Sequence, residues 1–97
     1  MLEIFQFIEP ETKPYDEAWS YWHPGLWHFG LTIPDLEATV ARIEAAGGRR
    51  QTDYFEVPSG SGYRLVFCLD PWGNALELMN VNCERMITRS LPPTIAQ

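Results

Sequence analysis

The sequence has little cysteine and no cysteine motif. Cys68 and Cys83 are its two cysteines among 97 residues, and they lack the spacing of a metal-binding or disulfide framework. Cys68 lies in an apolar stretch, so we expect a buried thiol there. The pattern argues against disulfides and fits a cytoplasmic protein.

Positive charge and long apolar runs are also scarce. Seven Lys and Arg residues stand against thirteen Asp and Glu residues, which gives a net charge of -6. No basic patch could neutralise phosphates, so nucleic acid is excluded as a partner. No apolar run approaches the length of a membrane span and no signal-peptide pattern occurs, so we expect no membrane partner.

What the sequence does have is apolar and aromatic content. Hydrophobic residues make up 45% of the chain, with four Trp, four Tyr and five Phe. This is enough for one small domain over residues 1–97, with a hydrophobic pocket or an interface. Within it we expect four segments: an extra strand, a connection, the main module and a tail (1–8, 9–25, 26–81 and 82–97).

The order of predicted elements indicates an α+β fold. The connection holds one helical turn over 16–22, and a short helix over 83–91 begins the tail. The main module reads strand, helix, strand, strand, strand (26–33, 35–46, 50–57, 63–69 and 75–81). Pro34 and Asp35 open the helix, and Gly47 and Gly48 end it.

The first strand of the module alternates between bulky and small or polar residues. Phe29 and Leu31 share one face with other large apolar residues, and His28 shares the other face with Gly30. We expect the helix to pack on the face with Phe29 and Leu31. The face with His28 would then remain open.

A tight turn leads into the last strand of the module. The turn begins at Asp70 and Pro71, and Gly73 and Asn74 can supply left-handed positions that close it. Glu77 follows between small and apolar neighbours. Such a carboxylate must face water or hold a partner such as a metal ion.

The chain start repeats this last strand. Residues 2–7 (LEIFQF) match residues 76–81 (LELMNV) position by position in residue type, and each copy has one Glu, Glu3 or Glu77. Six residues are a weak repeat signal, but two equivalent carboxylates are what a pseudo-symmetric metal site requires.

Residues 25–35 (GLWHFGLTIPD), the helix ending at Gly47 and Gly48, and the 70–79 motif together resemble one module of the vicinal oxygen chelate superfamily. This superfamily includes glyoxalase I, bleomycin-resistance proteins, epimerases and extradiol dioxygenases. The resemblance implies a βαβββ module with a cupped mixed sheet, here the C-terminal module of a two-module protein. Residues 1–8 resemble the last strand of the preceding module.

The resemblance also implies a site. His28 and Glu77 would bind a divalent metal (Ni, Co, Zn, Mn or Fe), with Glu3 as a further ligand. Glu77 would be the catalytic base, with Glu3 as the second candidate. Arg64, Met79 and Phe5 are the residues predicted to contact the substrate, although a surface role for Arg64 is the alternative.

The function that the resemblance implies is a metal-dependent lyase, isomerase or epimerase. It would act on a small oxygenated metabolite through a metal-stabilised enediolate. The alternatives are a non-catalytic drug-binding protein of the bleomycin-resistance type and an inactive half-length relic. A homodimer is expected, because His28 and Glu77 of two chains could then complete a set of two His and two Glu.

Overall fold

The computed structural model describes residues 1–11 and 28–90. In this part of the chain five strands and two helices follow one another: β1 (His28–Thr32), α1 (Leu36–Ala45), β2 (Arg49–Arg50), β3 (Phe55–Glu56), β4 (Arg64–Leu69), β5 (Ala75–Met79) and α2 (Cys83–Ser90). The α+β prediction is confirmed, and so is the predicted short helix after the last strand.

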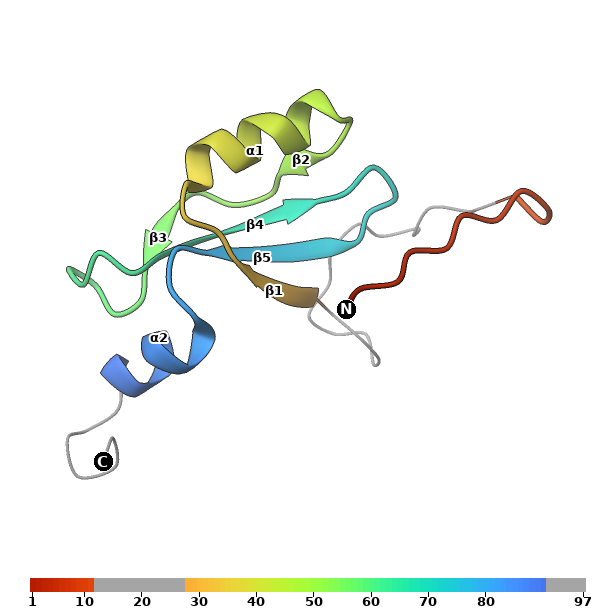
Figure 1. Ribbon diagram of the computed structural model, residues 1–97. Coiled ribbons are helices and arrows are strands. Elements are labelled where there is room, and N and C mark those ends of the chain that lie inside the picture. The colour runs from red at the N-terminus through yellow and green to blue at the C-terminus, as the bar shows by residue number, and fades with distance from the viewer. Residues whose placement is uncertain (12–27, 91–97) are drawn as a thin grey trace.

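A single mixed sheet contains all five strands. Its order is β1-β5-β4-β2, and β3 also pairs with β4. β1 runs parallel to β5, whereas the other pairs are antiparallel. Helix α1 covers one face of the sheet, and α2 lies toward the other (Figure 1). With the short β2 and β3 counted as two parts of one strand, the described elements form one βαβββ module with a helix added after it.

Helix α1 begins where the sequence predicts. The Asp35 carboxylate accepts a hydrogen bond from the Ala38 amide at 3.0 Å, which caps the first turn. Leu36 and Val40 are buried on its inner face. They pack into a core whose strand residues come from the centre of the sheet (Val66, Cys68 and Leu78).

Helix α1 packs on the face of the sheet that carries Phe29 and Leu31, as expected, but not over these two residues. Their exposed fractions are 41% and 39%. Both residues belong to β1, which is an edge strand, whereas α1 contacts β2 and β4. The sequence alternation identified the correct face of the sheet, but the position of the helix across that face depends on strand order.

The strand predicted over 50–57 is divided into β2 and β3. Between them, the amides of Gln51 and Thr52 both donate to the Phe67 carbonyl, at 2.8 and 3.3 Å. The Thr52 hydroxyl in turn accepts from the Phe67 amide at 3.0 Å. Two residues therefore stand opposite one, as in a bulge, and a side chain replaces one ladder bond.

The turn before β5 is organised by one side chain. The Asp70 carboxylate accepts hydrogen bonds from the Trp72 amide at 2.9 Å and the Asn74 amide at 2.8 Å. Gly73 adopts a φ of 90°, as predicted. Asn74 does not, since no described residue other than glycine has positive φ. This turn sets the start of β5 and hence the position of Glu77.

The strand predicted over residues 1–8 is not formed. Residues 1–7 have no strand pairing, residues 8–11 form a turn, and all eleven are exposed. A strand requires a neighbour for its backbone N–H and C=O groups, and this arm extends away from the sheet (Figure 1). The predicted connection over 9–25, with its helical turn at 16–22, falls mostly on residues outside the described ranges.

Within residues 1–11 and 28–90, neither helix has the length and apolarity needed to cross a membrane.

Candidate functional site

The pairing of β1 with β5 brings His28 and Glu77 together. In this parallel register Gly30 stands opposite Glu77 and His28 stands opposite Ala75. Side chains two residues apart on a strand share a face, so His28 and Glu77 lie on the same face of the sheet. The His28 Nε2 and Glu77 Oε2 atoms are 3.2 Å apart. The sequence prediction that these two residues meet is consistent with this geometry.

The pair lies on the face away from α1, and it remains accessible. The side chains of His28 and Glu77 are 22% and 17% exposed. Phe67 stands opposite Glu77 on β4 and forms an edge-to-face contact with the His28 ring, with ring centroids 5.1 Å apart. This contact restricts the imidazole on one side.

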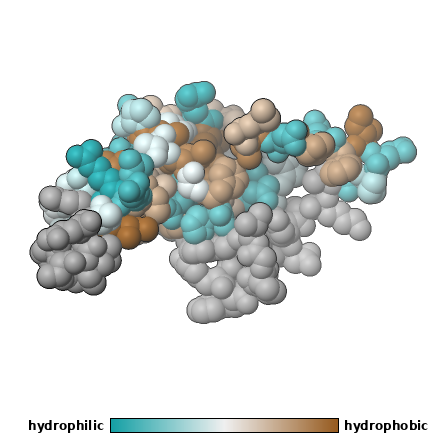
Figure 2. Space-filling view, turned by 60° about the horizontal axis from the view of Figure 1, so that its bottom comes forward, coloured by the Kyte–Doolittle hydropathy of each residue, from teal (hydrophilic) through white to brown (hydrophobic). Residues whose placement is uncertain are grey.

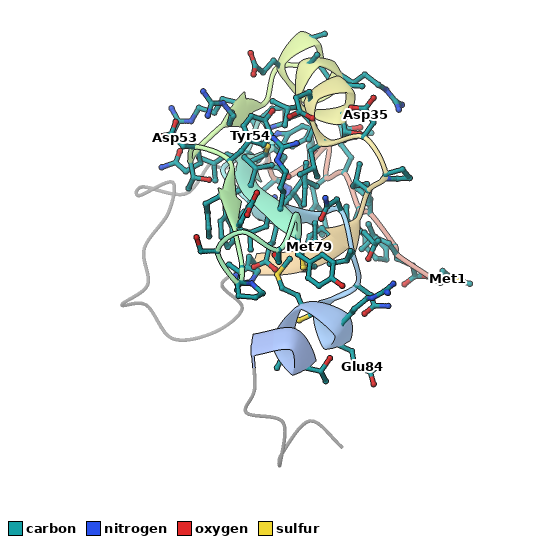
Figure 3. The ribbon with its side chains drawn as sticks, turned by 90° about the vertical axis from the view of Figure 1, so that its left-hand side faces the viewer. Met1, Asp35, Asp53, Tyr54, Met79 and Glu84 are labelled. Carbon is teal, nitrogen blue, oxygen red and sulfur yellow. The ribbon has the colours of Figure 1, made fainter. Side chains whose placement is uncertain are left out.

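Met79 and Gly30 lie next to Glu77 on the same face of the sheet. A Cβ atom added at Gly30 would lie 2.7 Å from the Met79 methyl group and 3.9 Å from Glu77 Oε1. The missing side chain at Gly30 therefore makes room for Met79 and leaves the second carboxylate oxygen uncrowded. Figure 3 shows Met79 on the side of the sheet toward α2, away from Asp35 at the start of α1.

Helix α2 closes one end of this face. Met86 is buried, and it packs in a cluster with Leu65, Phe67 and Met79. Phe67 thus contacts His28 and also belongs to the cluster beneath α2. The packing of α2 is in this way linked to the orientation of the site histidine.

Arg64 lies on the opposite face of the sheet. It shares the face of Val66 and Cys68, pairs with Glu37 of α1, and stacks over Tyr54 with its Cζ atom 4.9 Å from the ring centroid. The hydrogen bond from Arg64 lowers the pKa of Glu37 and raises that of Arg64. The structure therefore places Arg64 as a link between β4 and α1, as in the surface role considered for it, and does not bring it to Glu77.

The two arm residues predicted at the site are not brought to it. Glu3 is exposed, and Phe5 is 75% exposed. Met79 is the remaining residue predicted to contact substrate, and it does lie beside Glu77, although it is 4% exposed.

The types of donor atom in this pair fit a divalent ion. An imidazole nitrogen and a carboxylate oxygen, both partly exposed and 3.2 Å apart, are ligands that Zn, Ni, Co, Mn and Fe accept. They are two donors only, since residues 1–11 and 28–90 contain no group of three or more His, Cys, Asp or Glu suited to a metal. A complete site requires donors from elsewhere.

Phe67 and Gly30 were not among the predicted site residues. Alternation in β1 places Gly30 on the face of His28, so that signal was present in the sequence. Phe67 required the register of β4 against β5, which local sequence does not specify.

The sheet and its site define a class of protein: a βαβββ module with His and Glu on adjacent parallel strands of its open face. A family model supports this assignment. The Glyoxalase/Bleomycin resistance protein/Dioxygenase superfamily model matches residues 1–78, so the chain belongs to that superfamily. Comparisons with curated proteins and with solved structures gave no match.

Proposed function

We propose that this protein is a divalent-metal-dependent lyase or epimerase that acts on a small oxygenated metabolite. The observation that supports this most directly is the 3.2 Å approach of His28 Nε2 to Glu77 Oε2 on an accessible face. A divalent ion bound there would supply Lewis acidity toward a substrate carbonyl. Superfamily membership includes the chain among proteins with such chemistry.

Glu77 is the proposed proton carrier. Its Oε1 atom is near the bare position at Gly30, while its Oε2 atom is near His28. A carboxylate in this position can remove a proton from a carbon next to a carbonyl and return it to the same or the adjacent carbon. Bond electrons move toward the carbonyl oxygen and back, so the reaction has no net redox change.

His28 and the apolar neighbours would hold the reacting groups. Phe67 restricts the imidazole on one side, and Met79 lies beside Glu77. An apolar surround strengthens electrostatic interactions at the carboxylate by reducing its access to water. We further propose a homodimer, because a second chain can provide the donors that the described residues of one chain do not assemble.

The test begins with metal content. We expect bound metal in protein purified without chelator or affinity tag, measured by elemental analysis, and its loss in His28→Ala and Glu77→Gln. Glu56→Gln, an exposed carboxylate on β3, is the matched control and should retain the metal. If the protein stays metal-free after incubation with Ni, Co, Mn, Fe or Zn salts, the enzyme proposal fails.

The proton-carrier role has its own measurement. With α-keto and thioester compounds in deuterium oxide, NMR should detect exchange of the C–H next to the carbonyl. Glu77→Gln should slow this exchange by about 10²–10⁴-fold, while Glu56→Gln leaves it unchanged. An equal exchange rate in Glu77→Gln would remove Glu77 from this role.

A second candidate is a non-catalytic small-molecule binding protein. It is favoured by the observation that the described residues bring together two potential metal donors and no third. Saturable binding of an aromatic drug-like ligand to metal-free protein, with no turnover and no effect of Glu77→Gln, would support this function over the first.

A further inference from the structure

Helix α2 is attached to the sheet through one buried side chain. Among its described side chains, those of residues 83–88, only Met86 is buried. Met86 packs into an apolar cluster on β4 and β5 (Leu65, Phe67 and Met79). Arg85 adds a weaker contact, with its Cζ atom 5.9 Å from the centroid of the Tyr63 ring. Helix α1, in contrast, has two buried residues and an ion pair to β4.

The connection from β5 to α2 is fixed at both of its ends. The Asn80 side chain accepts a hydrogen bond from the Arg64 amide at 2.8 Å and donates one to a carbonyl of the turn before β4 at 2.9 Å. The Asn82 side chain caps α2 by accepting from an amide of its first turn at 2.7 Å. Val81 alone separates these two residues. A rotation of α2 away from the sheet can therefore be confined to a few bonds around Val81.

The outer surface of α2 is mostly hydrophilic. Glu84 and Arg85 are exposed, and Figure 2 shows hydrophilic residues at the end of the molecule where α2 lies. Ile87 is 54% exposed while α2 is packed, so detachment changes its surroundings little. An isolated helix of eight residues is not stable in water, so α2 would also lose its helical structure when it detaches.

The cost of detaching α2 follows from its single buried contact. Loss of a buried methionine contact changes an equilibrium by about 30–700-fold. On the order of 0.1–3% of the molecules would then have α2 detached while the sheet stays folded. A minor state with such a population is one that a ligand can select.

Met86 covers the apolar part of the site face. Phe67 stands opposite Glu77, and Leu65 and Met79 are the next opposed pair on the same face. These three apolar residues are 4–7% exposed, whereas the Glu77 side chain is 17% exposed. A polar group can therefore reach the carboxylate while α2 is in place. An apolar group can reach the surface beside the carboxylate only when Met86 has left it.

We propose that α2 is an autoinhibitory plug, in which Met86 occupies the place of the apolar part of a ligand. The ligand would carry an unbranched apolar chain, because the side chain that it replaces is an unbranched thioether. Its polar end would lie at Glu77 and His28, a placement that rests on the proposed function. Because binding requires α2 to detach, the affinity of the parent protein is reduced by the fraction of molecules in which α2 is detached.

Amide hydrogen exchange tests whether α2 detaches on its own. The Met86 amide donates to the Asn82 carbonyl at 3.1 Å within α2, whereas Val66 and Cys68 are fully buried on β4. We expect α2 amides to exchange about 30–700-fold more slowly than in an unfolded peptide, at a rate that dilute urea does not change. Amides of β4 should exchange far more slowly and accelerate with urea.

Two other exchange results would overturn the proposal. Equal rates and equal urea dependence in α2 and β4 would mean that α2 detaches only when the whole protein unfolds. Unprotected α2 amides would mean that α2 does not cover the sheet in solution.

Two α-keto acids test the ligand. The first, 2-oxohexanoate, has an unbranched apolar chain, and pyruvate has the same polar end without that chain. We expect Met86→Ala to bind 2-oxohexanoate at least about tenfold more tightly than the parent in titration calorimetry. Ile87→Ala is the matched control and should bind it like the parent, and pyruvate should bind all three proteins equally. If Met86→Ala binds 2-oxohexanoate no better than the parent, or not at all, the proposal is wrong.

The parent protein provides a measurement that does not depend on how Met86→Ala folds. Saturating 2-oxohexanoate should accelerate the exchange of α2 amides at least about tenfold, because the bound ligand keeps Met86 away from the sheet. Saturating pyruvate should leave this exchange unchanged. Slower exchange with 2-oxohexanoate would mean that α2 closes over the ligand, and that result would refute an autoinhibitory role.

Metal binding separates a failure of this proposal from a failure of the proposed function. If Met86→Ala gains affinity for 2-oxohexanoate but neither Co²⁺ nor Glu77→Gln changes that affinity, the plug stands and the enzyme proposal fails. If Co²⁺ binds at His28 and Glu77 but α2 and β4 exchange together, the proposed function stands and the plug fails alone.

Discussion

At the scale of single residues, Gly30 and Gly48 are both closely surrounded, but by atoms that differ in how easily they can move. An added Cβ at Gly48 would lie 2.6 Å from the Leu69 carbonyl oxygen and 2.6 Å from a methyl group of Ile43. At Gly30 the close neighbour is the methyl end of Met79. A backbone atom cannot move without disturbing the β4 ladder, whereas the end of a methionine adapts easily.

We therefore expect Gly48→Ala to lower the free energy of unfolding by about 1–3 kcal/mol. Gly30→Ala should lower it by less than about 1 kcal/mol, since Met79 can adopt another rotamer. Urea unfolding of the two variants beside the parent measures both values. Equal losses would contradict the view that the rigidity of the neighbour decides the cost.

Glu77 and Arg64 show how far the partners of a single residue can be predicted from the sequence. A lone carboxylate between apolar residues of a strand indicated that Glu77 faces water or has a partner, and the structure places His28 at 3.2 Å from it. For Arg64 the sequence left a substrate contact and a surface role open. Its position in β4 brings it to Glu37 on α1, which is consistent with the surface role.

At the scale of elements, α2 links the chain after β5 to the site face. Met86 is 4% exposed in the cluster with Phe67 and Met79, whereas its neighbour Ile87 is 54% exposed. Removing a buried side chain leaves a cavity, and removing an exposed one does not.

We expect Met86→Ala to lower the free energy of unfolding by about 2–4 kcal/mol and Ile87→Ala to change it by less than about 0.5 kcal/mol. Urea unfolding gives both values. Because Phe67 touches the His28 ring, Met86→Ala should also shift the His28 NMR resonances. An unchanged free energy of unfolding in Met86→Ala would mean that α2 does not pack on the sheet.

At the scale of the whole molecule, the proposed metal site should be visible as stability. A ligand that binds only the folded state stabilises it by about 2.7 kcal/mol at a concentration of 100 times its dissociation constant. We expect Co²⁺ to raise the thermal midpoint of the parent, and to leave that of His28→Ala unchanged. In the proposed homodimer a second chain supplies donors, so the midpoint should also rise with protein concentration.

If the thermal midpoint does not change with Co²⁺ but still rises with protein concentration, the dimer proposal stands and the metal proposal fails. The reverse result would place the metal site within one chain. Differential scanning fluorimetry at two protein concentrations, with and without Co²⁺, distinguishes the two results.

The local features of this protein can be predicted from short stretches of its sequence. The Asp35 cap, the Asp70 turn and the short helix α2 depend on hydrogen bonds and periodicities within a few residues. Local sequence is therefore enough to specify them, without contacts from distant parts of the chain. The alternation in β1 likewise determined that His28 and Phe29 face opposite sides of the sheet.

Which residues meet depends on contacts between distant parts of the chain. Strand order placed β1 at the edge, which left Phe29 and Leu31 partly exposed. The register of β4 against β5 put Phe67 opposite Glu77 and so against the His28 ring. The arm over residues 1–8 has the residue pattern of a strand but pairs with no strand among residues 1–11 and 28–90. Order, register and pairing arise from contacts between distant segments, which local sequence does not encode.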